Sequence, residues 1–235
     1  MQFGLGLACG VIALLVLAAP ICAQTAVGQH PLSEADQPHW AAIGQITYGG
    51  PEGSAICTGT LVAADLVLTA GHCVAVDGVV MQAGTIQFAA GWRAPKSLAI
   101  RHGAEIILAE PTAGQARSLS QDVALIVLDA PINAAGIIPL KLTRQDLFSE
   151  VYSFLGYRRD APDILQQATD CPFAGTTPGL LKLECPVVSG NSGAPVLAYR
   201  HGVWQVAGVM AAAVGGAAAL AVIPDDDLRA RIAGD

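Results

Sequence analysis

Charged residues are scarce in this chain of 235 residues, at 13% of the sequence, and no run rich in lysine or arginine occurs. The formal net charge is -7, because 19 acidic residues outnumber 12 basic ones. Nucleic acids and anionic lipid surfaces are themselves negative, so this balance disfavours both as partners. Hydrophobic residues make up 53% of the sequence, which is enough for a chain of this length to bury a large core.

Long apolar runs are absent after residue 23. Residues 1–23 contain no charged side chain, residues 5–19 are almost wholly apolar, and Pro20 precedes a small-residue cleavage site around Ala23. We interpret residues 1–23 as a secretory signal peptide, which predicts a secreted or periplasmic protein without membrane contact after cleavage. The usual basic residues ahead of the apolar segment are missing, so a retained membrane anchor stays the alternative. Residues 206–223 come next in apolar character, but glycines interrupt them and they fit two core strands better.

The rest of the chain has the pattern of an all-β protein. Residues 24–40 are polar and proline-containing, so we expect a flexible lead-in or a pro-segment there. From residue 41 onward, short alternating or β-branched runs are separated by Gly, Pro, Asn and Asp, which predicts strands in two groups, at about 41–131 and 145–223. Three aspartates at 225–227 precede residues 228–233 and favour a capped C-terminal helix over a calcium site. The expected strands are 45–48, 60–62, 66–69, 86–88, 105–108, 122–128, 151–155, 181–185, 195–199, 203–210 and 217–223.

Three segments carry side chains that suit nucleophilic catalysis. His72 lies in Thr-Ala-Gly-His-Cys at residues 69–73, Ser192 lies in Ser-Gly-Asn-Ser-Gly-Ala-Pro at residues 189–195, and the acid Asp122 lies between them. A serine hydroxyl becomes an effective nucleophile when an imidazole takes its proton and a carboxylate holds the other ring nitrogen. The three side chains therefore predict a nucleophile, a base and an orienting acid.

The order of the three residues distinguishes known arrangements, which run Ser-Asp-His in α/β-hydrolases, Asp-His-Ser in subtilisins and His-Asp-Ser in the chymotrypsin fold. Residues 190–194 do look like a hydrolase nucleophile elbow. After Ser192, however, the only histidine is His201, which leaves no room for a later acid and a separate histidine loop. Asp65 lies too close to His72 to supply the acid of the subtilisin order. Only the His-Asp-Ser order fits.

Four motifs in this order resemble those of trypsin-like serine proteases with the chymotrypsin fold, of the bacterial secreted type. The resemblance covers roughly residues 43–223 and rests on residues 57–62, 66–73, 121–128 and 190–195. It implies two packed six-stranded antiparallel β-barrels, together forming a protease domain at 41–235, and a secreted endopeptidase that works through an acyl-enzyme intermediate.

The resemblance also implies the roles of the site residues. Ser192 attacks the scissile carbonyl, His72 accepts its proton and later donates it to the leaving amine, and Asp122 fixes the imidazole tautomer. The backbone N–H groups of Gly190 and Ser192 are expected to form the oxyanion hole.

Six cysteines are encoded, and four of them follow the expected signal peptide. The resemblance places a disulfide between Cys57 and Cys73, and we then expect Cys171 and Cys185 to form the second one. Free buried thiols and a four-cysteine metal site are the alternatives. Neither pair has the spacing of about two to four residues that is typical of zinc ligands, so we expect no metal and no cofactor.

Substrate preference is predicted by counting back from the serine. The resemblance places the base of the primary pocket at Pro186, with Val187 above it, and the opposite wall at Ala211, Ala212 and Ala213. The base is not acidic, which disfavours a strict preference for Arg or Lys, and the small apolar wall suggests an uncharged side chain. Glutamyl-cleaving relatives use a Thr and a His around this pocket, and no histidine follows residue 201 to play that part.

Two functional hypotheses from different classes follow. One is an active, monomeric endopeptidase acting on protein or peptide substrates, and the other is an inactive homologue that binds peptides or a partner protein in the same cleft. The intact set of His72, Asp122 and Ser192 favours the first. Asn191 stands where the digestive relatives keep an Asp that pairs with a newly freed amino terminus, and an Asn cannot form that ion pair. We therefore expect no activation by insertion of a new N-terminus, although removal of residues 24–39 stays possible.

Overall fold

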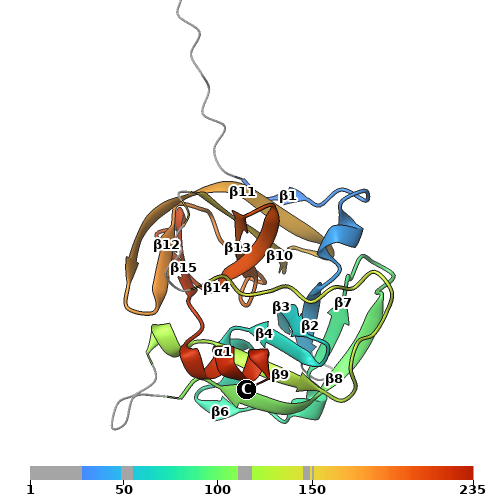
Figure 1. Cartoon of the computed structure of the whole chain (residues 1–235). Coiled ribbons are helices and arrows are strands. Elements are labelled where there is room, and N and C mark those ends of the chain that lie inside the picture. The colour runs from blue at the N-terminus through green and yellow to red at the C-terminus, as the bar shows by residue number, and fades with distance from the viewer. Residues whose placement is uncertain (1–27, 49–54, 111–117, 145–148, 150, 235) are drawn as a thin grey trace, which may run out of the picture.

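Two groups of strands pack side by side in the computed structural model, which describes residues 28–48, 55–110, 118–144, 149 and 151–234. Figure 1 shows the first group in blue to green and most of the second in orange to red. This all-β architecture confirms the fold class predicted from the sequence. The expected signal peptide and the first residues of the expected lead-in lie outside the described residues.

The first group closes into a six-stranded antiparallel barrel. Alternation along the strands sends apolar side chains such as Ile46, Leu61 and Ile126 into the interior, where they are fully buried. The strand order is β2-β3-β4-β9-β8-β7. The bounds are β2 Ile43–Tyr48, β3 Ala55–Ala63, β4 Leu66–Thr69, β7 Gln87–Ala90, β8 Ala99–Leu108 and β9 Ala124–Leu128, with a small hairpin of β5 Ala75–Val76 and β6 Val79–Val80. Short 3-10 helices cover Gln37–Trp40, Gly71–Cys73, Ala83–Thr85 and Leu119–Gln121.

The second group is a sheet in the order β1-β11-β10-β13-β14-β15-β12. Because β11 also pairs with β12, six of these strands form a closed ring, and β1 is added outside it. The ring is the second six-stranded barrel that the resemblance implied. The bounds are β1 His30–Pro31, β10 Val151–Arg158, β11 Ala161–Thr177, β12 Leu180–Leu183, β13 Pro195–Arg200, β14 Val203–Val214 and β15 Ala218–Val222.

The N-terminal segment differs from the flexible lead-in expected over residues 24–40. From residue 28 onward it is ordered, and Figure 1 shows the blue β1 beside β11 of the second barrel. His30 and Pro31 pair with Gln167 and Gln166, and Leu32 is only 1% exposed. The flexible lead-in was expected because this segment is polar and contains prolines. The buried side chain of Leu32 and the short β1 ladder nevertheless hold the segment on the second barrel.

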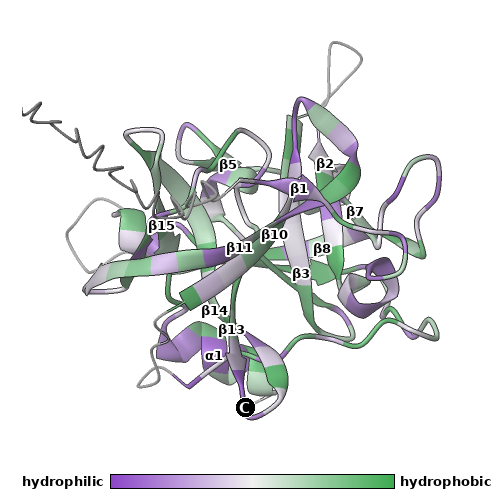
Figure 2. Ribbon diagram, turned by 90° about the horizontal axis from the view of Figure 1, so that it is seen from above, coloured by the Kyte–Doolittle hydropathy of each residue, from purple (hydrophilic) through white to green (hydrophobic). Residues whose placement is uncertain are grey.

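The longest strand, β11, was not among the strands expected from the sequence. Pro162, Pro172 and several polar residues interrupt its hydrophobic pattern. The strand continues past these breakers because its pairing with β10 changes register, and Asp170 adopts a left-handed φ of 58° near that irregularity. Hydrophilic and hydrophobic bands follow one another along β11 in Figure 2, as expected for a wall with one solvated face.

The C-terminal helix α1, Asp226–Ala233, confirms the prediction of a capped helix. Asp225 is the N-cap, and its side chain accepts a hydrogen bond of 2.9 Å from the N–H of Leu228. Leu228 is buried in a core cluster shared with both barrels. None of the helices in the described part of the chain reaches the length and apolar character needed to cross a bilayer.

Candidate active site

The pairing of two neighbouring strands brings His72 and Asp122 together. Thr69, the last residue of β4, lies opposite Ala124, the first residue of β9. His72 follows Thr69 after one short turn, and Asp122 precedes Ala124 by two positions. Both side chains therefore emerge at the same end of the first barrel, although 50 residues separate them in the sequence.

Asp122 contacts His72 through both carboxylate oxygens. Oδ2 lies 2.6 Å from the ring Nδ1, and Oδ1 accepts a hydrogen bond of 2.7 Å from the backbone N–H. The Asp122 side chain is 16% exposed and that of His72 is 44% exposed, so the acid is largely covered while the ring faces solvent. Gly71 permits this approach, because a Cβ there would lie 2.9 Å from Asp122 Oδ1.

The loop that carries Ser192 connects β12 to β13 and lies against the histidine segment. Gly193 adopts a φ of 81°, and a Cβ at this position would run into Thr58 O and Thr69 Oγ1 and lie 3.1 Å from Ala70 N. The backbone next to Ser192 is thus in contact with residues that lead directly to the histidine. Among the described residues, no hydrogen bond joins Ser192 Oγ to His72 Nε2, and such bonds are often long without substrate.

Thr58 of β3 is a connection between the two barrels that sequence reasoning missed. It is fully buried, and its backbone N–H donates a bond of 2.8 Å to Ser192 O. Its hydroxyl donates to Gly190 O at 3.0 Å and accepts from the N–H of Tyr157 on β10 at 2.9 Å. No sequence signal distinguishes it from Thr60, which lies two positions on along the same strand and is equally buried.

Tyr157 itself is held between the barrels. Its hydroxyl donates a hydrogen bond of 2.8 Å to Trp92 O, and burial raises the pKa of Tyr157. The phenol therefore stays neutral and acts as a fixed structural donor.

The backbone N–H groups around Ser192 fall into two sets, those with an acceptor in the protein and those without one. The N–H groups of Asn191, Gly193 and Ala194 all donate to carbonyl oxygens within the protein. In the described part of the chain, those of Ser189, Gly190 and Ser192 donate to none. Gly190 has a φ of 100°, and a Cβ there would lie 2.7 Å from the backbone N of Arg159, so only glycine fits.

Asn191 is the best-packed polar side chain of the loop, with no exposed surface. Its Nδ2 donates to Tyr157 O at 2.9 Å, and its Oδ1 accepts from Val188 N at 3.0 Å and from Gln29 Nε2 at 2.8 Å. Gln29 Nε2 also donates to Pro186 O at 3.0 Å. Gln29 is a second residue that the sequence did not single out, since it lies 162 positions from its partner.

The residues expected around the substrate pocket lie in the first part of this loop and on the neighbouring strand β14. Pro186 and Val187 are half-buried between β12 and the serine. Ala211, Ala212 and Ala213 continue β14 beyond Met210, which exchanges backbone hydrogen bonds with Gly193 and Ala194. Ala211 and Ala212 are half-buried and Ala213 is exposed.

Both expected disulfides are present. Cys57–Cys73 and Cys171–Cys185 have Cα–Cα distances of 6.1 Å and 5.3 Å. The first joins β3 to the turn that carries His72. His72 and the sulfurs of this disulfide lie within 4.8 Å of one another, but oxidised sulfurs are not the thiolates that bind zinc.

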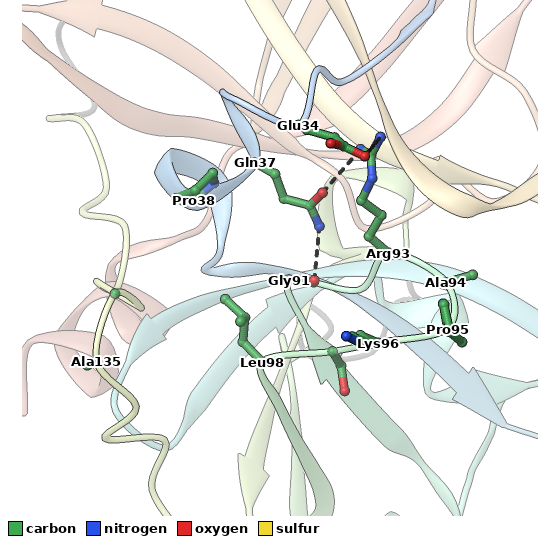
Figure 3. A pocket seen from close by; sticks show the side chains of 12 residues that line it. Glu34, Gln37, Pro38, Gly91, Arg93, Ala94, Pro95, Lys96, Leu98 and Ala135 are labelled. Atoms are coloured by element: carbon green, nitrogen blue, oxygen red, sulfur yellow. Dashed lines mark hydrogen bonds and ion pairs between the residues drawn. The ribbon is translucent and has the colours of Figure 1, made fainter.

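A cavity of about 650 Å³ lies elsewhere on the molecule, between the N-terminal segment and the turn after β7 (Figure 3). Gln37 is one of the residues that line this cavity. Its Nε2 donates a hydrogen bond to Gly91 O, and its Oε1 accepts one from Arg93, both at 3.1 Å. None of the expected catalytic residues lines this cavity.

Comparison with known families places the chain in one of them. A family model described as Trypsin matches residues 26–168, which is more than half of the chain. The chain belongs to the trypsin family. Membership in this trypsin-like serine protease family supports a peptidase that acts on protein or peptide substrates. The matched span includes His72 and Asp122 and ends before the serine loop.

Solved structures share the trypsin-family fold. A Glu endopeptidase in complex with MPD has a TM-score of 0.71 at 20% identity, covering 88% of this chain and 95% of its own. AL20, a thermostable serine protease from an extremophilic microorganism, has a TM-score of 0.64 at 17% identity, covering 79% of this chain and 92% of its own. No curated protein sequence is similar enough to this chain to count as a match.

Proposed function

We propose that this trypsin-family protein is a secreted serine endopeptidase whose catalytic groups are Ser192, His72 and Asp122. The observation that carries the proposal is the double contact of Asp122 with the ring and the backbone of His72, at 2.6 Å and 2.7 Å. A carboxylate accepts hydrogen bonds, so it keeps the ring proton on Nδ1 and leaves the Nε2 lone pair free to act as a base.

The reaction proceeds in two halves. Ser192 Oγ attacks the scissile carbonyl while His72 Nε2 takes its proton, and the protonated ring then gives that proton to the leaving amine. Water attacks the resulting acyl-enzyme by the same steps in reverse. Asp122 stays ionised throughout and stabilises the imidazolium. We expect activity to fall in acid, because a protonated His72 cannot accept the serine proton.

The N–H groups of Gly190 and Ser192 serve as the oxyanion hole in this mechanism. The supporting observation is that neither has an acceptor within the described residues, whereas the N–H groups of Asn191, Gly193 and Ala194 do. Donors held ready in this way stabilise the negative oxygen of the tetrahedral intermediate, and losing one typically costs about two to three orders of magnitude in rate.

Secretion is supported by the two disulfides, because such bonds form and persist in oxidising compartments. The proposed signal peptide at residues 1–23 would direct the chain there.

The proposed substrate has an uncharged side chain at the primary position. No acid lies at Pro186 or Val187, and Glu184, two residues earlier, is exposed to solvent. Although one similar structure is a Glu endopeptidase, the last histidine here, His201, is exposed in the turn between β13 and β14. Cleavage of a random peptide library should occur after uncharged residues. A dominant preference for Arg, Lys or Glu would contradict this assignment.

A fluorophosphonate probe tests the proposed activity directly. The wild-type protein should be labelled on Ser192, as located by mass spectrometry, and should cleave a denatured protein substrate. The Ser192→Ala variant should fold with the same circular dichroism spectrum but take up no label. A folded wild-type protein that is neither labelled nor active would support the peptide-binding homologue instead.

A further inference from the structure

Gln29 connects the N-terminal segment to both sides of the proposed catalytic loop. One side-chain nitrogen donates to Asn191 Oδ1 at 2.8 Å and to Pro186 O at 3.0 Å. Asn191 precedes the proposed nucleophile, and Pro186 is the proposed base of the substrate pocket. Asn191 Nδ2 already donates to Tyr157 O, so its Oδ1 is the acceptor and Gln29 must be the donor.

The position of Gln29 is fixed by the residues that follow it. His30 and Pro31 form the β1 ladder with β11, and Leu32 N donates to Leu165 O at 2.8 Å. Leu32 is also buried in the core. A side chain placed one residue before such an anchor loses little additional freedom when it forms its two bonds.

The geometry points to Gln29 as a positioning residue that holds residues 186–191 in the conformation needed for catalysis, an inference that rests on the proposed function. Each contact of this clasp, defined as Gln29 with Asn191 and Pro186, is a hydrogen bond between uncharged groups. The clasp therefore does not depend on a free ammonium group at the start of the mature chain. It also means that residues from Gln29 onward belong to the working enzyme and are not a removable pro-segment.

Removing the clasp should change substrate binding more than the chemical step. Without its two bonds the loop exchanges between ordered and disordered forms, and substrate binds only the ordered one, so apparent KM rises while kcat at saturation is kept. For Gln29→Ala we expect KM to rise about tenfold, as for the loss of hydrogen bonds worth about 0.5–1.5 kcal/mol each, with kcat within about twofold. A role confined to global stability would instead lower the active fraction at an unchanged KM.

Two further variants make the test specific. Gln29→Glu keeps the size of the side chain but places a carboxylate against two acceptor oxygens, so its KM should rise at least as much as that of Gln29→Ala. Gln37→Ala is the matched control, because Gln37 lies in the same segment and also makes two hydrogen bonds, to Gly91 and Arg93 (Figure 3). It touches no residue of the serine loop and should keep the KM of the wild type.

Steady-state kinetics on a peptide substrate decide between these outcomes, together with amide hydrogen exchange of the full mature chain. In Gln29→Ala, the amides of Val188 and Asn191 should exchange faster than in Gln37→Ala, because both belong to the loop that the clasp holds. Equal KM values for Gln29→Ala and Gln37→Ala would overturn the inference. If the wild type is inactive, the proposed function fails separately, and the exchange rates still decide: faster exchange in Gln29→Ala keeps the clasp, and equal exchange removes it.

Discussion

Asp122 uses one oxygen for the ring of His72 and the other for its backbone N–H, so it fixes both the tautomer and the place of the ring. In Asp122→Asn the amide oxygen can still accept from the backbone, which turns the NH₂ group toward Nδ1. The ring proton then moves to Nε2, where the base is needed. We predict a fall in kcat of about four orders of magnitude with little loss of stability, measured by steady-state kinetics and thermal unfolding.

The chain offers a matched control for this substitution. Asp129 also meets a histidine twice, with Oδ1 accepting from the backbone N–H of His102 at 3.3 Å and Oδ2 lying 4.0 Å from its Nδ1. This pair is about half exposed and lies apart from the serine loop. Asp129→Asn should leave kcat unchanged, and an effect comparable with that of Asp122→Asn would contradict the assigned role.

Gly193 combines a left-handed φ of 81° with backbone and side-chain oxygens where a Cβ would lie. We predict that Gly193→Ala loses most of its activity and about 1–3 kcal/mol of unfolding free energy, measured by urea denaturation. Gly202, in the turn between β13 and β14, has a similar φ of 84° but no atom within 4 Å of its Cβ position. Gly202→Ala therefore reports backbone strain alone, and an equal cost at both sites would show that the contact with β3 is unimportant.

At the scale of elements, β3 supplies the hydrogen bonds that join the barrels at the site. Thr58→Val keeps the shape of the side chain but leaves Gly190 O and Tyr157 N without their partner. We predict a loss of about 1–3 kcal/mol in unfolding free energy. We also predict lower kcat, because Gly190, a proposed oxyanion donor, loses the hydrogen bond to its own carbonyl. Both effects should appear in one set of denaturation and kinetic measurements.

Thr60 is the control within the same strand. It is as buried as Thr58, but its hydroxyl has no hydrogen-bond partner in the described part of the protein. Thr60→Val removes an unsatisfied polar group, so it should be neutral or stabilising. Equal losses of unfolding free energy in Thr58→Val and Thr60→Val would contradict this prediction. They would mean that side-chain shape, and not hydrogen bonding, determines the contribution of β3 to stability.

The comparison of Thr58 with Thr60 also shows which contacts the sequence could not predict. Strand alternation predicts that both lie on the face of β3 opposite Leu61, and it cannot tell which one meets the second barrel. The strands with regular apolar patterns, such as β4 and β13, were predicted to within a residue or two. The strand β11 was missed, because its two prolines and its bulge are accommodated by pairing partners that the local sequence does not reveal.

At the scale of the whole molecule, each barrel has its own disulfide. Cys171–Cys185 joins β11 to the segment after β12, within the core cluster of the second barrel. Replacing both cysteines by alanine should lower the unfolding free energy by about 3 kcal/mol, since a loop of this size constrains the unfolded chain. Denaturant unfolding measures the loss. Kinetics should show kcat retained at low temperature, and a folded variant without activity would place this bond in the site.

The proposed catalytic segments stand out in the sequence because each combines a reactive side chain with a local motif. His72 precedes a disulfide cysteine, and Ser192 is surrounded by glycines. Gln29 lies in no recognisable motif. Its proposed function depends on the pairing of β1 with β11, two strands that lie more than a hundred residues apart in the sequence. Contacts of this kind follow from the completed topology and not from any window of the sequence.

The contacts of Gln29 with Asn191 and of Thr58 with Ser192 also determine how much of the chain must fold before the proposed activity can appear. If the chain is exported unfolded and amino end first, as the proposed function implies, both of these residues emerge long before the part that they must meet. Until the last third has crossed, the nucleophile has no scaffold. We expect a half-translocated chain to be harmless to the export machinery around it, so that destructive chemistry begins only once the whole chain has emerged.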